Sequence, residues 1–120
     1  MTIGDAVILR GGVYKARLDP TEGSEIQGSR PVVVVSRNSI NQNSPVVVIV
    51  PLTDARNKAR IYPSQTQITK GDGGLEIDSV ALGEQIRVIK KSRLTEFKGT
   101  LSERTMSSIS SALKITLDLP

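Results

Sequence analysis

Residues 23–36 read GSEIQGSRPVVVVS, a stretch that joins a polar loop to a strongly apolar run. Four consecutive valines next to turn-forming residues are typical of a buried central strand. Pro31 biases the residue before it towards extended backbone, so Arg30 is expected to begin this strand. An arginine at that joint lies at a loop edge, where a rigid scaffold commonly positions functional groups.

Further strands are predicted along most of the chain. Residues 13–18 alternate between apolar and polar side chains, as a half-buried strand does. The other predicted strands are 46–50 with Leu52 at its end, a short edge strand within 61–68 that Pro63 breaks, a longer strand over 79–90 bent near Gly83, and a short strand over 94–100. Polar loops are predicted at 19–29, 37–45 and 53–60, and a flexible turn at 70–74.

The C-terminal segment has a different period. Ser102 is a suitable N-cap, and Glu103 follows it in the first turn, where the helix dipole favours a carboxylate. Apolar residues then recur at helical spacing, at Met106, Ile109, Ala112, Leu113 and Leu117. The predicted fold is therefore mainly β with a C-terminal helix: one domain, residues 1–120, built as a small, mostly antiparallel β-barrel on which the helix packs.

Composition narrows the chemistry. The 120 residues include 16 Lys and Arg against 12 Asp and Glu, so the net charge of +4 favours an anionic partner. The chain has no histidine and no cysteine, which removes the usual acid–base residue, thiolate chemistry and disulfides. Carboxylates do not cluster with the spacing of metal ligands, so neither a metal nor another cofactor is expected. No signal peptide or membrane-spanning run is apparent, which predicts a cytoplasmic protein that does not enter a membrane.

Several short motifs occur in a fixed order from about Gly12 to Leu117. They are Arg17-Leu18-Asp19-Pro20, Gly23-Ser24-Glu25, Arg30-Pro31-Val32-Val33-Val34 with Ser36, Pro51-Leu52-Thr53, Asp78-Ser79-Val80 and Glu84-Gln85-Ile86-Arg87. In this order and spacing the chain resembles the MazF/PemK toxin family. The resemblance implies an SH3-like barrel of the MazF/PemK/CcdB type and a homodimer. It also implies the toxin of a type II toxin–antitoxin system, with an acidic MazE-like antitoxin as partner. The activity implied is metal-independent, sequence-specific cleavage of single-stranded RNA, which stops translation and growth.

The same resemblance assigns roles to individual residues. Arg30 would hold the scissile phosphate as the principal catalytic residue, and the hydroxyl of Thr53 would bind the same phosphate. The RNA-binding surface would include Glu25, Gln27, Ser29, Arg56, Lys58, Gln85 and Arg87. Gln85 and Arg87 are expected to share one face of a strand because side chains alternate along it.

Each of these residues also has an ordinary structural interpretation. Arg30 alone could be a surface arginine at a strand start, and Thr53 could close its strand through a local turn. Glu25 and Arg87 could simply be solvated. So could two basic clusters that could otherwise bind phosphates: the basic loop directly after Thr53, with Arg56, Lys58 and Arg60, and a second cluster of Lys90, Lys91 and Arg93.

Two other functions remain compatible with the sequence. A toxin of the same fold could bind and poison DNA gyrase, as CcdB-type proteins do. A barrel of this type could also bind RNA without cutting it. The combination of Arg30-Pro31 and Thr53 favours the ribonuclease. The fold alone would not decide among these functions.

Overall fold

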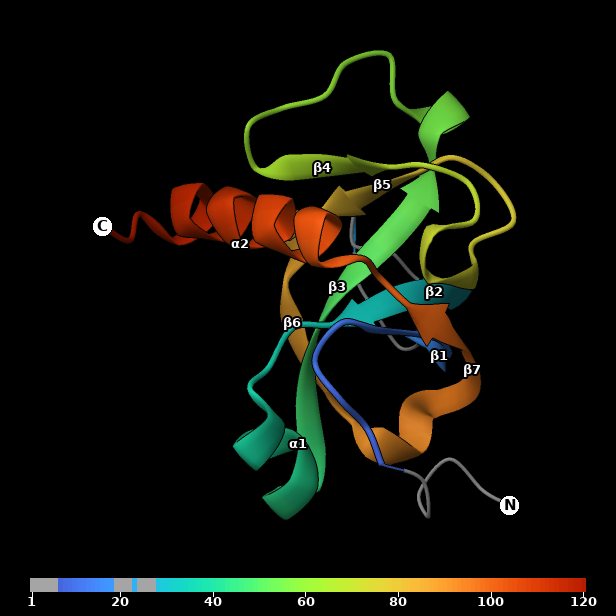
Figure 1. Ribbon diagram of the computed structural model, residues 1–120, viewed down its shortest axis with the longest axis vertical. Helices are drawn as coiled ribbons and strands as arrows, with labels where there is room; N and C mark the ends of the chain where they lie inside the picture. The colour runs from blue at the N-terminus through green and yellow to red at the C-terminus, as the bar shows by residue number, and fades with distance from the viewer. Residues whose placement is uncertain (1–6, 19–22, 24–27) are drawn as a thin grey trace.

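The computed structural model describes residues 7–18, 23 and 28–120, which form a curled antiparallel sheet with one long helix against it (Figure 1). The strands are β1 (Gly12–Arg17), β2 (Ser29–Val34), β3 (Val46–Asp54), β4 (Gln65–Ile68), β5 (Ser79–Leu82), β6 (Arg87–Lys90) and β7 (Leu94–Thr100). The helices are α1 (Asn38–Asn43) and α2 (Glu103–Leu117). Short 3-10 turns lie at η2 (Ala55–Asn57), η3 (Asp72–Gly74), η4 (Gly83–Gln85) and η5 (Lys91–Arg93).

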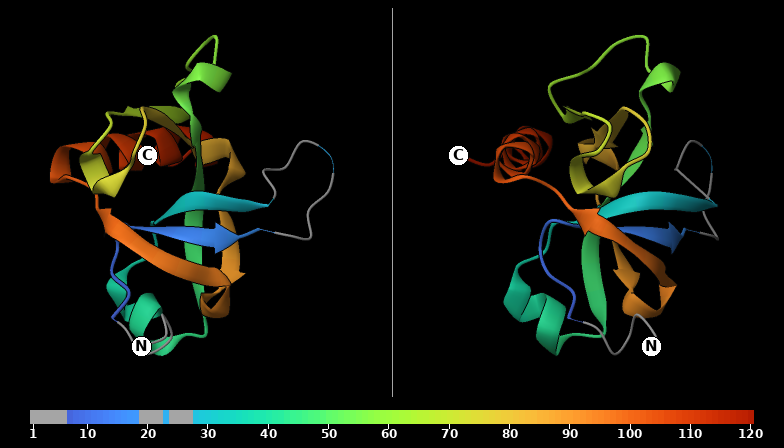
Figure 2. Two further views of the ribbon diagram at one scale, coloured as in Figure 1. Left: turned by 90° about the vertical axis from the view of Figure 1, so that its right-hand side faces the viewer. Right: turned by 45° about the vertical axis from the view of Figure 1, so that its right-hand side comes forward.

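Strand β3 organises the sheet. The strand order is β4-β5-β3-β2-β1-β7, with β6 paired to β3 off this path. The first half of β3 pairs with β6 at Val46–Ile49, and its last three residues pair with β5. Strand β2 pairs with the middle of β3, from Val32 opposite Pro51 to Val34 opposite Ile49. The sheet therefore curls around β3 (Figure 2).

The curl buries both faces of the central strands. Val32 and Val34 belong to one apolar cluster, together with Ile49 and Leu94. Val33 belongs to a second cluster with Leu52, Ile68 and Ile109 of the helix. An unbroken valine run is what a strand between two cores requires, because no position along it faces water.

Helix α2 confirms the predicted C-terminal helix. The Ser102 hydroxyl accepts a hydrogen bond from the backbone N–H of Thr105, as an N-cap should. Ile109 and Ala112 are buried against the sheet, whereas Leu117 is half exposed. Over the described ranges, no helix has the length and apolar character needed to cross a bilayer.

Two predicted elements were wrong in detail. The predicted loop 37–45 contains helix α1, and the buried Asn41 side chain hydrogen-bonds Ser36 there. The predicted strand 79–90 is two strands, β5 and β6, separated by η4. The break occurs at Gly83, where any side chain would collide with the carbonyl oxygen of Ser64.

The barrel is also less complete than predicted, although the mainly β architecture with its C-terminal helix is confirmed. Strands β4 and β7 stand at the two ends of the described strand order and do not pair with each other. Turn η3 approaches β7 between them, and its Asp72 binds the start of α2 by accepting from Ser102 and Thr105. The sheet is therefore curled but open, with the predicted flexible turn 70–74 held in place by this carboxylate.

Candidate active site

Arg30 and Thr53 line one groove of about 460 Å³. Arg30 lies near the start of β2 and is half-buried, and Thr53 lies near the end of β3 and is buried. Leu52, Leu75 and Ile77 form an apolar part of the groove wall. The structure thus brings together the two residues that the resemblance marks as catalytic, in a setting that partly excludes water.

The register of two strands places this pair. The last paired residues of the β2–β3 ladder are Val32 and Pro51. Beyond them the ladder ends, because Pro31 has no N–H with which to extend it; β2 continues along β1, and β3 continues along β5 on its other edge. The groove opens where the ladder ends, with Arg30 on one strand and Thr53 on the other.

Charged side chains of both signs surround the pair. Lys15 and Lys98 lie in the groove with Arg30, and Glu76 and Glu96 oppose them. Lys98 Nζ is 3.8 Å from Glu96 Oε2, an ion pair on β7. The groove therefore combines cations for a phosphate with carboxylates that can accept a proton or the donor groups of a base.

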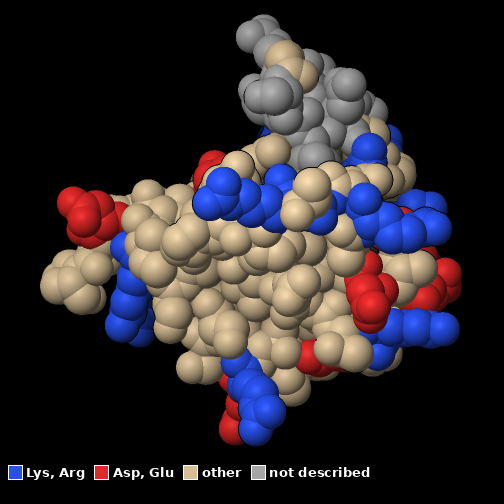
Figure 3. Space-filling model, turned by 90° about the horizontal axis from the view of Figure 1, so that it is seen from above, with Lys and Arg blue, Asp and Glu red and all other residues tan. Residues whose placement is uncertain are grey.

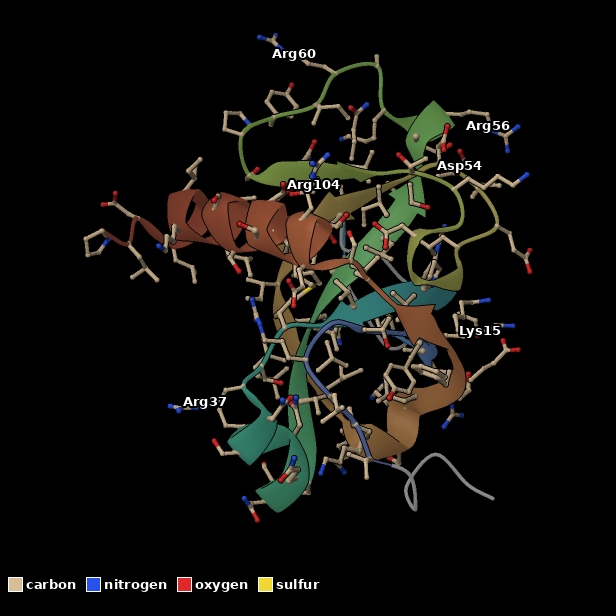
Figure 4. All side chains as sticks on the ribbon, in the orientation of Figure 1. Lys15, Arg37, Asp54, Arg56, Arg60 and Arg104 are labelled. Atoms are coloured by element: carbon tan, nitrogen blue, oxygen red, sulfur yellow. The ribbon has the colours of Figure 1, made fainter. Side chains whose placement is uncertain are left out.

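A tightly paired arginine and aspartate stand at the end of β3. Arg56 Nη2 lies 2.6 Å from Asp54 Oδ2, and its Nε lies 3.1–3.2 Å from both carboxylate oxygens. The two side chains meet on the same side of the molecule as Lys15 (Figure 4). Hydrogen bonds from the Arg56 side chain and backbone lower the pKa of Asp54, and the same side-chain contacts raise the pKa of Arg56.

This pairing changes the expectation for Arg56. Its guanidinium is engaged by Asp54, and it lines an adjoining hollow with Lys70 and Asp78 rather than the groove of Arg30. Asp54, Glu76 and Ile77 line both hollows, so the two adjoin. Arg56 lies next to the candidate site, with one edge committed to a neighbouring carboxylate.

The predicted basic loop after β3 has an aromatic partner. Lys58 Nζ is 5.9 Å from the centre of the Tyr62 ring, and the guanidinium carbon of Arg60 is 5.5 Å from it. Arg60 extends from this loop away from the rest of the molecule (Figure 4). A ring face flanked by two cations suits an unpaired base and its phosphate.

The other predicted RNA-binding residues fall into three groups. Ser29 lines the groove beside Arg30. Gln85 and Arg87 do not line the groove. They also do not share a strand, because Gln85 ends turn η4 and Arg87 begins β6. The Arg87 side chain donates to the Leu18 carbonyl at 3.4 Å. The expectation that alternation puts them on one face was therefore wrong. Glu25 and Gln27 lie outside the described residues.

Sequence reasoning missed several residues of the groove, among them Lys15, Asn57, Glu76 and Lys98. Asn57 Nδ2 donates to the Thr53 hydroxyl oxygen at 3.2 Å, from η2. Only its spacing, four residues after a candidate catalytic threonine, could have drawn notice. The others come from strands and a loop distant in sequence, and strand pairing and loop placement bring them here.

Comparison with known proteins gives a consistent result. A family model described as "PemK-like, MazF-like toxin of type II toxin-antitoxin system" matches residues 9–117. The chain is 45% identical over 113 residues to a protein named endoribonuclease MazF of Staphylococcus epidermidis, covering 94% of this chain and 93% of the relative. It is 43% identical over 110 residues to the protein of the same name from Staphylococcus saprophyticus, covering 92% and 91%.

Solved structures share the fold. A mycobacterial endoribonuclease superposes with a TM-score of 0.78 at 28% identity, covering 96% of this chain and 95% of that one. A mycobacterial endoribonuclease in complex with its cognate antitoxin gives the same TM-score and identity, covering 94% and 97%. MazF from Deinococcus radiodurans gives a TM-score of 0.81 at 22% identity, covering 96% and 100%, which bears on the fold alone.

Proposed function

Because the chain belongs to the family of PemK-like, MazF-like toxins of type II toxin–antitoxin systems, we propose that it is an endoribonuclease that cuts single-stranded RNA in the groove of Arg30 and Thr53. The observation that carries the proposal is the meeting of these two side chains in one groove. The resulting loss of messenger RNA would stop translation and growth in the cytoplasm.

The proposed reaction uses the substrate's own nucleophile. The 2′-oxygen of a ribose attacks the adjacent phosphorus, forming an O2′–P bond while the P–O5′ bond breaks. The proton of the 2′-hydroxyl passes to a general base, and a general acid protonates the leaving O5′. The products are a 2′,3′-cyclic phosphate and a 5′-hydroxyl, and the sequence resemblance implies that no metal takes part.

Negative charge accumulates on the non-bridging oxygens during this displacement. The planar guanidinium of Arg30 suits two of these oxygens at once. A hydrogen bond from Thr53 would add a second, uncharged donor to the same group. Because Leu52, Leu75 and Ile77 form part of the groove wall, they would displace some water from the phosphate and strengthen both interactions.

Substrate binding in this proposal relies on more than the scissile phosphate. Ser29 and the carboxylates Glu76 and Glu96 can hydrogen-bond base edges or ribose within the groove. Lys58 and Arg60 with Tyr62 would hold the strand farther along. Glu25, Gln27, Gln85 and Arg87 are retained as proposed contacts by family resemblance, and Glu25 as a proton acceptor or base contact.

Two protein partners complete the proposal. An acidic antitoxin suits the net charge of +4, and a mycobacterial relative is known in complex with its cognate antitoxin.

The second partner is another copy of the chain. Charged side chains gather at the rim of the face seen from above and leave its middle largely uncharged (Figure 3). On α2, Ile115 is 58% exposed. We propose that a second copy packs against this face of the helix; Ile115→Glu should then shift the protein to monomer in analytical ultracentrifugation, and an unchanged dimer would refute this placement.

The proposed activity is tested by incubating the protein with a long single-stranded RNA in excess EDTA, beside its Arg30→Ala variant. Cuts at one short sequence, absent with a variant that is equally folded, would support the ribonuclease. A folded wild-type protein that leaves the RNA intact would contradict it. Binding of that RNA without cuts would favour the non-catalytic alternative, and inhibition of DNA gyrase would favour the gyrase poison.

A further inference from the structure

Asn57 occupies a position that matters for the donor role of Thr53. A threonine hydroxyl has one proton to donate and two lone pairs with which to accept. The Asn57 side-chain amide donates to this oxygen at 3.2 Å and so occupies one lone pair. The hydroxyl proton must then point away from Asn57, and both side chains line the groove that also contains Arg30.

The turn that carries Asn57 is held at several points. The Asp54 carboxylate caps it by accepting from the Arg56 backbone N–H at 2.9 Å. The Lys58 N–H closes it onto the Ala55 carbonyl at 3.1 Å, and the Ala55 N–H donates to the Asp78 carbonyl at 2.9 Å. The Arg56 side chain also donates to the other carboxylate oxygen, Asp54 Oδ2. Hydrogen bonds therefore hold both oxygens of the capping carboxylate. This exposed turn therefore reverses the chain direction, so that the Asn57 side chain reaches the Thr53 hydroxyl four residues earlier.

We propose that Asn57 is a positioning residue, which fixes the Thr53 hydroxyl as a hydrogen-bond donor towards the scissile phosphate of single-stranded RNA. This inference rests on the proposed ribonuclease function and deepens it. Without Asn57 the hydroxyl can rotate, and part of its population presents a lone pair to the phosphate oxygens, which repels them. Asn57 would thus act through Thr53, on the transition state more than on substrate binding.

A double-mutant cycle tests this role, with kcat and KM measured for cleavage of one RNA. Asn57→Ala should lower kcat about 10-fold with little change in KM, the effect expected from one misaligned hydrogen bond. The isosteric Asn57→Asp variant cannot donate at neutral pH and should be at least as impaired. Asn57→Ala should have the same effect in a Thr53→Ser background, which keeps the hydroxyl, and no effect in a Thr53→Ala background.

Asn43 provides the matched control. It is an exposed asparagine on α1 whose amide also donates one hydrogen bond, to the Ser39 carbonyl at 2.8 Å, and it does not line the groove. Asn43→Ala should leave kcat unchanged, and thermal melts of all variants should show that the Asn57 variants stay folded at the assay temperature.

Three outcomes would overturn the inference. Full activity of Asn57→Asp would show that the donor is not needed. An equal fall in kcat from Asn57→Ala in the Thr53→Ala background would show that Asn57 acts on the RNA itself. Both results leave the ribonuclease proposal intact, whereas a wild-type protein that cuts no RNA would refute that proposal and this inference together.

Discussion

Arg30 and Thr53 lie at matching distances beyond the last rung of the β2–β3 ladder: each is two residues past the pair formed by Val32 and Pro51. Had the ladder continued, the two would face each other as sheet neighbours. It ends instead at Pro31, which has no N–H for the next rung, and β2 continues along β1 while β3 continues along β5. Where the ladder ends, Arg30 and Thr53 line one groove instead of forming a cross-strand pair, which places the proposed catalytic arginine at the end of a valine-rich core strand.

Removal of the Thr53 hydroxyl should slow cleavage strongly. Thr53→Ala deletes a donor aimed at developing charge, a change that costs about 10²–10³-fold in kcat in comparable sites. Thr53→Ser keeps the hydroxyl and should retain activity within about tenfold of wild type. Steady-state kinetics on one RNA would check this, and a Thr53→Ala rate equal to wild type would reduce Thr53 to a strand-end residue.

The basic loop with Tyr62 should contribute binding that depends on salt. Replacing Lys58 and Arg60 together by alanine should weaken binding of a 2′-O-methyl RNA, which cannot be cut. The slope of log K against log salt should fall by about 1.4, because each phosphate neutralised on a single strand contributes about 0.7. Lys90→Ala with Lys91→Ala removes the same charge elsewhere and is the control. Equal slopes for both pairs would mean that the loop makes no specific interaction with RNA.

Helix α2 should be a major source of stability through Ile109. This side chain is 1% exposed and packs in the cluster that contains Val33 and Leu52. Ile109→Ala should lower the free energy of unfolding by about 2–5 kcal/mol, the usual cost of a buried isoleucine truncated to alanine. Ile40→Ala, at an isoleucine 40% exposed on α1, should change it by less than about 0.5 kcal/mol in the same urea titration. Similar effects at both sites would argue against this packing.

Stability should fall in acid partly through Asp72. Burial alone would raise the pKa of this carboxyl, but hydrogen bonds from the Thr105 hydroxyl and from the Ser102 backbone and hydroxyl outweigh it and lower the pKa. A carboxyl whose pKa is lower in the folded state stabilises that state at higher pH. This contribution disappears as the pH falls from the unfolded value, about 4, through the folded one.

Asp72→Asn isolates that effect, because it removes the charge and keeps the size of the side chain. The variant should be less stable than wild type by about 1–3 kcal/mol at pH 7. The difference should begin to narrow as the pH falls below about 4 and should disappear once the folded wild-type carboxyl is protonated too. Urea titrations across this pH range measure the difference, and one that stays constant down to about pH 2 would exclude the ionised Asp72 as its cause.

Local sequence predicted the elements with a clear apolar pattern. The unbroken valine run and the helical repeat after Ser102 are both followed by burial, whereas the strand at 94–100 was predicted although only Leu94 on it is buried. Helix α1 was missed because its sequence, NSINQN, has neither an apolar face nor good helix formers. It is held by the local buried pair of Ser36 and Asn41 and by the backbone N–H of Arg10, which donates to Asn38 Oδ1 from 28 residues away, a contact that no short window of sequence displays.

The site was predictable only in part for a similar reason. Arg30 and Thr53 stand in recognisable motifs, but Lys15, Glu76 and Lys98 reach the groove through strand pairing and loop placement. Arg56 was predicted to bind RNA, and the sequence did not indicate that an aspartate two residues away engages one edge of its guanidinium. The net charge of a loop predicts whether its partner is anionic or cationic. Ion pairs within the loop then decide which charged side chains remain available to that partner.

The most direct test of the proposed mechanism is to map both ends of every cut made in excess EDTA, on an RNA and on a copy with a single 2′-deoxy nucleotide on the 5′ side of the cut. We predict 2′,3′-cyclic phosphate and 5′-hydroxyl ends from wild type, no cut in the 2′-deoxy copy, and no cut in either RNA by a folded Arg30→Ala variant. Cleavage of the 2′-deoxy copy, or full activity of Arg30→Ala, would contradict this mechanism.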